Sequence, residues 1–463
     1  MAHFLNSLDN LIWGIPLVVI ILFTGIYLSK GLSFLQLFHL KKALKLTLSE
    51  EEEEGNGEIS SFAALCTALS ATIGTGNMIG VATAICQGGP GALFWMIIAA
   101  FFGMATKYSE GFLAIRYRSI DEDGTVTGGP FTYIEYGLGP KWKPLAIIFA
   151  FFGIGVAMLG NGTFTQVNGI TNSVAMFVDP MNHLSFQLLG HSIPTIIAIT
   201  GLIVTVLAAL VIIGGIQRIS AVAEKVVPFM AICYIVIGLI FIAFNLTSIP
   251  AAFVKIVQSA FGLRAVSGGI LGTMIIAMQK GIARGIFSNE AGLGSAPIAA
   301  ASAITDNPVR QGLISMTGTF FDTIIICTIT GLTIVITGAW NNGLEGIQVT
   351  NYAFQTGLPF NTKFTSFIIM MCLTIFSFTT IIGWNFYGEK CLGYLSKNNG
   401  KALIIYRVLY IFALFVGPYF TLTEVWTLAD IFNGLMAIPN ILALLLLSPL
   451  VFKETREQIR KKR

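Results

Sequence analysis

The sequence predicts an all-α integral membrane protein with eleven transmembrane helices. Hydrophobic residues make up 55% of the 463 positions and charged residues only 11%, and the mean hydropathy is +0.79. Soluble domains carry about 25% charged residues, so this composition excludes an ordinary soluble globule. Each of the eleven apolar stretches also reaches the length of about 20 residues that a bilayer crossing needs. The six cysteines are scattered without a CxxC pair, and neither a disulfide framework nor a metal site is predicted.

The apolar stretches follow one another along the whole chain. They are predicted at residues 11–30, 60–87, 90–115, 144–174, 190–214, 225–245, 267–304, 310–337, 363–387, 402–420 and 425–451. Turn motifs such as Gly88–Gly91 and Gly128–Pro130 mark several of their ends. The seventh stretch is too long and too polar for one simple helix, and we expect one crossing joined to half-helix elements.

The charges of the loops predict the orientation in the membrane. With the N-terminus outside, the outer loops hold only Lys255, Arg264 and Lys363. The inner loops and the tail then collect the basic residues at Lys30–Lys45, Arg116–Lys143, Arg218–Lys225, Arg310, Lys390–Lys401 and Lys453–Arg463. This asymmetry obeys the positive-inside rule and places the C-terminus in the cytoplasm. The acidic run Glu50–Glu54 is expected to be a solvated surface segment of the first inner loop.

The second span contains a stretch whose residues disfavour an unbroken membrane helix. Residues 70–80 read SATIGTGNMIG, so glycines and hydroxyl or amide side chains meet in the middle of the span. Irregular backbone in the membrane persists only where it lines a protected cavity, since an unpaired N–H or C=O costs several kcal/mol there. A helix broken at this place would offer amides and carbonyls to an ion or a zwitterion. The alternative is a small-residue packing seam between helices.

A second stretch of the same kind decides in favour of broken helices. Residues 71–84 (ATIGTGNMIGVATA) align with 289–302 (NEAGLGSAPIAAAS), and the two begin spans two and seven. An odd number of crossings separates them, so one is inverted relative to the other. Paired interrupted segments in corresponding halves of an inverted repeat indicate the central site of a secondary transporter.

Polar residues gather at four places within the apolar spans. These places are residues 70–77, 160–168, 287–295 and 376–385. Their carbonyls, hydroxyls and amides suit a hard monovalent cation, whereas zinc or copper would require His or thiolate ligands. The amides of Thr75 and Gly76 would suit an amino-acid carboxylate, because a half-helix N-terminus carries partial positive charge.

Two carboxylates, Glu290 and Asp322, are predicted to be buried, and an acid inside the membrane is a functional candidate. Glu290 could instead pair with Lys280 or Arg284 and tie half-helices together. For Asp322 the alternative is a structural hydrogen bond at the head of span eight. Trp384 could close a small pocket, or it could be an ordinary packed aromatic residue.

The motifs of several enzyme classes are missing. The chain contains no Walker loop, no HExxH and no GxSxG, and the glycines at 74 and 76 lack the spacing of a dinucleotide fingerprint. An enzyme is therefore not expected, and no nucleic-acid partner is predicted. Transport driven by an ion gradient is favoured over transport driven by ATP.

Long motifs resemble one known family. The strings are TIGTGNMIGVATAICQGGPGALFWM (72–96), GMATKYSEGFLA (103–114), GIARGIFSNEAGLGSAPIAAA (281–301) and FTTIIGWNFYGEK (378–390). They are similar to the alanine/glycine:cation symporters, over nearly the whole chain. The resemblance implies a leucine-transporter-type fold with an extra N-terminal helix and linker (1–58), two inverted five-helix repeats (59–245 and 246–452) and a basic tail (453–463).

The resemblance also implies roles for individual residues. Thr75 and Gly76 would hold the substrate carboxylate through their amides, with Asn77 beside them. The substrate site would further include Gln166, Asn168, Phe287, Ser288 and Trp384. Sodium would be bound by carbonyls of Ser70, Ile73 and Phe376 and by hydroxyls of Thr379 and Thr380. Thr163 departs from the asparagine of many relatives, which makes the polar lining of that span less certain.

The function that the resemblance implies is import of alanine or glycine with sodium across a prokaryotic inner membrane. Sodium would be the coupling ion, no cofactor is expected, and a monomer in membrane lipid would suffice. A proton-coupled or glutamine-preferring symporter of the same fold stays open, because some family members use these. A passive channel or a substrate-sensing receptor is the alternative from another class. A channel would not accumulate its substrate, and a receptor would usually carry a soluble signalling domain.

Overall fold

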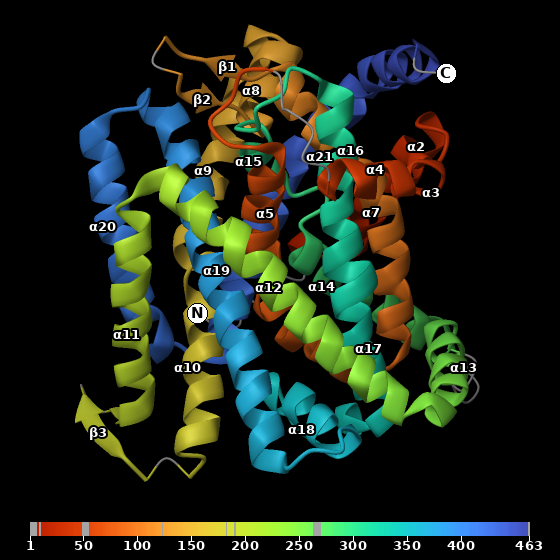
Figure 1. Cartoon of the computed structure of the whole chain (residues 1–463), viewed down its shortest axis with the longest axis vertical. Helices are drawn as coiled ribbons and strands as arrows, with labels where there is room; N and C mark the ends of the chain where they lie inside the picture. The colour runs from red at the N-terminus through yellow and green to blue at the C-terminus, as the bar shows by residue number, and fades with distance from the viewer. Residues whose placement is uncertain are drawn as a thin grey trace.

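The computed structural model describes residues 7–8, 11–48, 55–122, 124–181, 183–188, 191–262 and 270–461. These residues form a bundle of long helices that run roughly along one axis, with short crossing helices at both ends (Figure 1). Within the described residues, eight helices are long and apolar enough to cross a membrane. A ninth crossing is possible if a bent helix pair counts as one span.

The helices before the middle of the chain are α2 (Ile15–Gly31), α3 (Leu35–Phe38), α4 (Leu40–Leu48), α5 (Ser61–Thr72), η1 (Gly76–Gly80), α6 (Val81–Gly88), α7 (Gly91–Arg116), α8 (Pro130–Thr132), η2 (Tyr133–Gly137), η3 (Pro140–Trp142), α9 (Lys143–Leu159), α10 (Phe164–Val178), α11 (Thr195–Ile212) and α12 (Gly215–Phe244). The later ones are η4 (Leu246–Ser248), α13 (Ile249–Ala260), α14 (Ile270–Asn289), α15 (Ala296–Ala300), α16 (Pro308–Thr319), η5 (Phe320–Cys327), α17 (Thr328–Thr337), η6 (Ala339–Asn341), α18 (Ile347–Gly357), α19 (Thr362–Ser396), α20 (Gly400–Val416), η7 (Gly417–Tyr419) and α21 (Leu422–Lys461).

Two antiparallel hairpins lie outside the bundle. Strands β1 (Ser119–Ile120) and β2 (Val126–Thr127) pair so that Ser119 faces Thr127. Strands β3 (Ser185–Leu188) and β4 (His191–Pro194) pair from Ser185 opposite Pro194 to Leu188 opposite His191. The two hairpins lie at opposite ends of the bundle (Figure 1).

Asparagine side chains begin several of the long helices. Asn307, Asn361 and Asn399 each accept a hydrogen bond from a backbone N–H in the first turn of α16, α19 and α20. Such caps satisfy one of the four amides that a helix N-terminus leaves unpaired. The starts of these helices therefore follow local sequence chemistry.

The predicted interruption of the second span is confirmed. Helix α5 ends at Thr72, and the chain resumes in η1 and α6 at an angle of 51°. The seventh span is interrupted as well, since α14 ends at Asn289 and α15 begins at Ala296. Between them, Glu290, Gly292 and Gly294 have positive φ values of 57°, 92° and 81°. Left-handed backbone cannot continue an α-helix, which is why the helix stops there.

The count of eleven crossings and the inverted repeat stay predictions. Two of the predicted spans differ from the observed helices. The first span corresponds to α2, which has only 17 residues, and α14 of the seventh span begins directly after residues 263–269, which lie outside the described part. Beyond the predicted spans, α13 and α18 are short helices at the end of the bundle opposite α4 (Figure 1).

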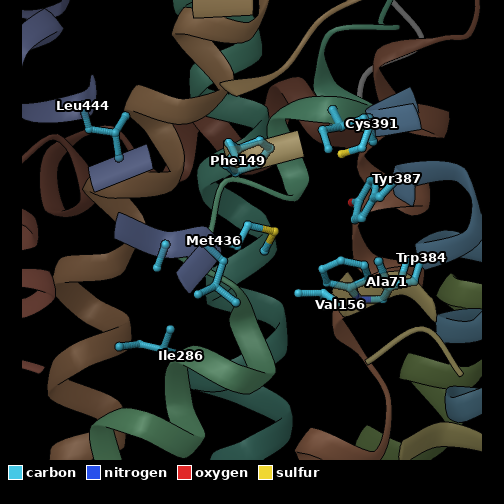
Figure 2. Packing of buried hydrophobic residues seen from close by; sticks show 14 of the residues in the cluster. Ala71, Phe149, Val156, Ile286, Trp384, Tyr387, Cys391, Met436 and Leu444 are labelled. Atoms are coloured by element: carbon cyan, nitrogen blue, oxygen red, sulfur yellow. The ribbon is translucent and has the colours of Figure 1, made fainter. Parts of the chain in front are cut away.

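The main core packs around the helices that hold the site. Figure 2 shows Trp384, Tyr387 and Cys391 of α19 facing Met436 of α21, with Phe149 of α9 close by. Each of these side chains is buried. Helix α9 packs against both α19 and α21, and α7 packs against α14 and α16. The two interrupted helices are thus held between unbroken ones, which gives their irregular backbone a fixed frame.

Candidate functional site

The first break is held open by side chains that bind its backbone. Asn77 Oδ1 accepts a hydrogen bond from Gly74 N at 2.9 Å, and Gln166 Oε1 of α10 accepts one from Thr75 N at 3.1 Å. The carbonyl of Ile73 accepts the hydroxyl of Thr380 at 3.1 Å. These bonds replace the ones that a continuous helix would make, so the cost of unpaired backbone in the membrane is avoided.

Carbonyl and hydroxyl oxygens lie close together where the end of α5 meets α19. The carbonyl of Phe376 accepts the hydroxyls of Thr379 at 2.8 Å and Thr380 at 3.0 Å, and Thr380 also reaches Ile73. Four of the five residues expected to bind sodium therefore converge. The fifth, Ser70, is buried in the last turn of α5, just before Ile73, and a Cβ added at Gly383 of α19 would lie 2.6 Å from its hydroxyl oxygen. Carbonyl and hydroxyl oxygens of this kind can replace the hydration shell of a hard monovalent cation.

The two breaks contact each other through glycine. A Cβ added at Gly76 would lie 3.1 Å from the backbone Cα of Ser288. The two segments can therefore approach this closely because Gly76 has no side chain. Asp322 joins the same two segments: it accepts a hydrogen bond from Asn77 at 2.6 Å and one from Ser288 at 2.9 Å. Thr323 donates a third at 2.6 Å.

Asp322 occupies a different place from the one predicted. It lies in η5, in the middle of the helical run 308–337, and not at the head of that span. The π-helical turn there widens the helix and points the carboxylate at both breaks, a feature often found at functional sites. The side chain is completely buried.

Glu290 binds two polar side chains inside the protein. Trp384 Nε1 donates to Oε1 at 2.8 Å, and Ser295 donates its hydroxyl to Oε2. Arg284, which the sequence offered as an alternative partner, forms its ion pair with Asp430 instead. Trp384 therefore serves as a hydrogen-bond donor that connects α19 to the second break, beyond any role in limiting a pocket.

The expectation of only two buried carboxylates was wrong, because Glu110 and Asp430 are buried as well. Glu110 Oε1 accepts hydrogen bonds from Gly292 N at 3.1 Å and Gly294 N at 3.2 Å, and from Asn440 Nδ2 at 2.7 Å. It thus caps the second break. The signal was present in the sequence, since the carboxylate stands within an apolar span.

Lys107 is a second residue that sequence reasoning missed. Its side chain is buried, and its Nζ makes no hydrogen bond within the part of the chain described. It lines a cavity of about 20 Å³ together with Thr72 and Asn289, at the edges of the two breaks. That space suffices for one water molecule. Its electrostatic partners are the buried Glu110, Glu290 and Asp322.

One side of the site is closed by an ion pair and two aromatic rings. Arg284 of α14 binds Asp430 of α21 through two hydrogen bonds of 2.9 Å and 2.7 Å. The rings of Phe287 and Trp426 lie with centroids 4.6 Å apart, and the guanidinium carbon is 4.7 Å from the Trp426 centroid. Phe287, which was expected beside the substrate, therefore belongs to this group of an ion pair and two aromatic rings.

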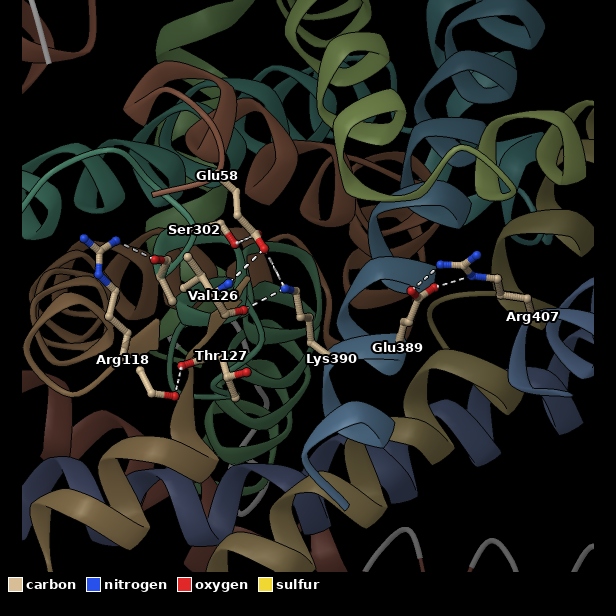
Figure 3. Close-up of polar contacts among 10 residues, drawn as sticks. Glu58, Arg118, Val126, Thr127, Ser302, Glu389, Lys390 and Arg407 are labelled. Atoms are coloured by element: carbon tan, nitrogen blue, oxygen red, sulfur yellow. Dashed lines mark hydrogen bonds and ion pairs between the residues drawn. The ribbon is translucent and has the colours of Figure 1, made fainter. Parts of the chain in front are cut away.

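The opposite side has a vestibule of about 570 Å³ near the start of α5 and the end of α19. Glu58 forms an ion pair with Lys390 at 3.2 Å, and Ser302 donates to the same carboxylate (Figure 3). Glu389 and Arg407 form a second ion pair beside it (Figure 3). The segment before α5 is thus joined to α19 by the Glu58–Lys390 ion pair, whereas Glu389 and Arg407 join α19 to α20.

Asn168 is the predicted substrate residue that the structure places apart from the breaks. It donates to the carbonyl of Phe420 at 3.0 Å and accepts from Asn172 at 2.8 Å. Gln166, two residues earlier, does contact Thr75. A helix turns by about 100° per residue, so two positions apart cannot share one face.

The fold, with its two interrupted helices, is that of leucine-transporter-type membrane transporters. Among solved structures, the chain resembles that titled "Crystal structure of MhsT in complex with L-phenylalanine", with a TM-score of 0.56 and 10% identity over 86% of this chain and 98% of that one. The family follows from the sequence: a model of the sodium:alanine symporter family matches residues 1–463, and the chain belongs to that family.

Relatives named as transporters match the chain almost end to end. An uncharacterized transporter of Haemophilus influenzae is 50% identical over 99% of this chain and 96% of its own length. The sodium/alanine symporter AgcS of Methanococcus maripaludis is 45% identical over 98% and 97%. The probable sodium/glutamine symporter GlnT of Bacillus subtilis is 35% identical over 100% and 92%. The family thus couples amino-acid transport to sodium in multi-pass membrane proteins.

Proposed function

We propose that this chain imports a small neutral amino acid, alanine or glycine, by symport with sodium. The observation that carries the proposal is the convergence of the Ile73 and Phe376 carbonyls with the Thr380 hydroxyl beside an interrupted helix. A neutral amino acid needs no charged partner for its carboxylate there, because bared amides at a half-helix N-terminus attract anions. The name of the AgcS relative supports alanine.

The substrate would lie at the contact between the two breaks. Thr75, Gly76 and Asn77 would meet the carboxylate, and the amide of Thr75 would exchange its bond to Gln166 for one to the substrate. Ser288 and Phe287 lie against Gly76 and would limit the size of the side chain. Asn168, which lies apart from the breaks, and Trp384 would act indirectly, through the helices that they connect.

Asp322 and Glu290 are proposed to be linked to the cation. Asp322 places a buried carboxyl group between the two breaks, and its partners Asn77 and Ser288 also carry oxygens that could face an ion. Glu290 would fix the second break through Trp384. A bound cation would stabilise the ionised form of these buried carboxyl groups.

Alternating access would open the two sides of the site in turn. On the side taken as extracellular, Arg284 and Asp430 would separate to admit the substrate. On the side taken as cytoplasmic, the Glu58–Lys390 contact would part so that α5 could tilt and open the vestibule. The N-terminus outside and C-terminus inside follow from the loop charges.

The test is uptake of labelled alanine into proteoliposomes. We expect accumulation when a sodium gradient points inward and none when choline replaces sodium. A panel of glycine, alanine, serine and glutamine would then assign the substrate. Uptake that ignores sodium and follows a pH gradient would establish the proton-coupled alternative, to which the name of a putative sodium/proton-dependent alanine carrier, a relative from Bacillus subtilis, also points. Equilibration without accumulation would indicate a channel.

The Thr380→Ala variant is expected to weaken sodium activation more than substrate recognition. Loss of one hydroxyl ligand would cost about 1–2 kcal/mol, which raises the half-activating sodium concentration by roughly 5- to 30-fold. The measurement is alanine uptake as a function of sodium concentration. Thr374→Ala on the same helix is the control, because that hydroxyl makes no hydrogen bond within the described residues. Unchanged sodium activation in Thr380→Ala would remove this residue from the site.

A further inference from the structure

A groove of about 300 Å³ lies between α4, the beginning of α16 and the end of α21. Two exposed lysines of α4, Lys42 and Lys45, stand on one wall. The remaining surface includes the apolar side chains of Leu46, Val309 and Ile459. The groove therefore combines positive charge with an apolar wall. A bare phosphate would contact only the charged part, and a neutral apolar ligand would contact only the apolar part.

The segment that carries the lysines has the composition of a membrane-surface helix. Leu37, Phe38 and Leu48 are exposed by 57%, 75% and 73%, although they flank the lysines of α4. A helix with exposed lysines and exposed large apolar residues lies in the interface between headgroups and acyl chains. Ala43 and Thr47, on its other face, are buried, and Thr47 meets Thr317 of α16 at 3.3 Å. The groove therefore opens at the level of lipid headgroups.

The surroundings of the groove add positive potential. Helix α16 begins there, with Pro308 in its first turn and Asn307 as its cap, so the positive end of its dipole points to the groove. Helix α21 brings the exposed Lys453, Arg456 and Arg460 to the same end of the bundle. On the orientation proposed above, this end faces the cytoplasmic leaflet, which carries the anionic lipids.

We propose that the groove binds an anionic phospholipid, with Lys42 and Lys45 at its phosphate and Leu46, Val309 and Ile459 along the first part of an acyl chain. The bound lipid joins α4 to α16 and α21, and so stabilises the helix that leads into η5. A free phosphate reaches only the polar groups of the groove and gains nothing from the apolar wall. The proposal rests on the proposed orientation, but its test measures lipid binding and not transport.

The experiment uses the full chain, purified in an uncharged detergent and stripped of lipid. Its thermal unfolding is followed after addition of phosphatidylglycerol, of phosphatidylcholine with the same acyl chains, or of glycerol 3-phosphate. A ligand that binds only the folded state raises Tm. We expect phosphatidylglycerol to raise Tm and the other two additions to leave it nearly unchanged. Equal stabilisation by phosphatidylcholine would overturn the proposal, and so would a full effect from glycerol 3-phosphate.

Two matched variants locate the effect. In Lys42→Gln/Lys45→Gln, the rise in Tm caused by phosphatidylglycerol is expected to fall by at least half. Lys397→Gln/Lys401→Gln removes two exposed lysines next to the turn between α19 and α20, at the same end of the bundle, and is expected to keep the full rise. An undiminished rise in the α4 variant would overturn the proposal.

Discussion

Gly74→Ala is expected to abolish sodium-dependent uptake while the protein still inserts into the membrane. A Cβ at this position would lie 2.5 Å from Thr380 Oγ1 and 2.9 Å from Gln166 Oε1. Both atoms hold the first break, since Thr380 binds the Ile73 carbonyl and Gln166 binds Thr75 N. Overpacking costs about 1–3 kcal/mol, and each displaced hydrogen bond adds about 1 kcal/mol. The apparent sodium affinity should therefore fall roughly 100-fold or more.

Gly80→Ala is the matched control, because a Cβ there meets Trp426 Cη2 at 3.7 Å, an ordinary contact. Both glycines belong to the same interrupted span, so a general effect of alanine on helix geometry would appear in both variants. The readouts are membrane expression and sodium-dependent alanine uptake in proteoliposomes. Parent-like sodium activation in Gly74→Ala would show that the Ile73–Thr380 region does not bind the ion.

Arg284→Met is expected to lower stability more than any other single change in the closed side of the site. Removal of one partner from a buried ion pair leaves an uncompensated charge and costs about 3–5 kcal/mol. The side chains of Arg284 and Asp430 are only 12% and 10% exposed, and the guanidinium also lies over the Trp426 ring. The variant should therefore lose this cation–π contact as well, which is worth about 0.5–2 kcal/mol.

The double variant Arg284→Met/Asp430→Leu separates the two contributions. It removes both charges, so much of the lost stability should return, because buried ion pairs and apolar replacements are often nearly equal in energy. Thermal unfolding of the purified protein measures both steps. Uptake should stay impaired in the double variant if the pair acts as an outer gate, whereas full recovery of uptake would restrict Arg284 and Asp430 to a structural role.

Much of the site could be predicted because its residues are recognisable from the local sequence. Glycines and hydroxyl residues inside an apolar span mark the break at 70–80 and the polar turn of α19 at 376–385. Backbone groups in lipid must be satisfied, so such residues signal irregular structure wherever they occur. The partners could not be predicted in the same way. That Asn77 and Ser288 share Asp322, or that Trp384 binds Glu290, depends on contacts between residues 34 to 245 positions apart.

Glu110 shows why a local reading fails for charges. A carboxylate in an apolar helix is visible in the sequence, but its task of capping Gly292 N and Gly294 N depends on how α7 packs against the second break. The same holds for Arg284, whose partner Asp430 lies 146 positions away. For Asp322 the sequence placed the residue near the head of a span, and only the π-helical turn of η5 brings it to the centre.

The sequence by itself determined that this is a helical membrane protein with two interrupted spans, and which oxygen-bearing residues lie beside the interruptions. Hydrophobicity and helix-breaking chemistry are properties of a segment, and the cost of unpaired backbone in lipid makes them decisive. Only the tertiary structure decided which side chains satisfy the opened backbone, which charges neutralise one another and where the site is closed. Those contacts join helices distant in the chain, and their packing selects among the many partners that a polar side chain could accept.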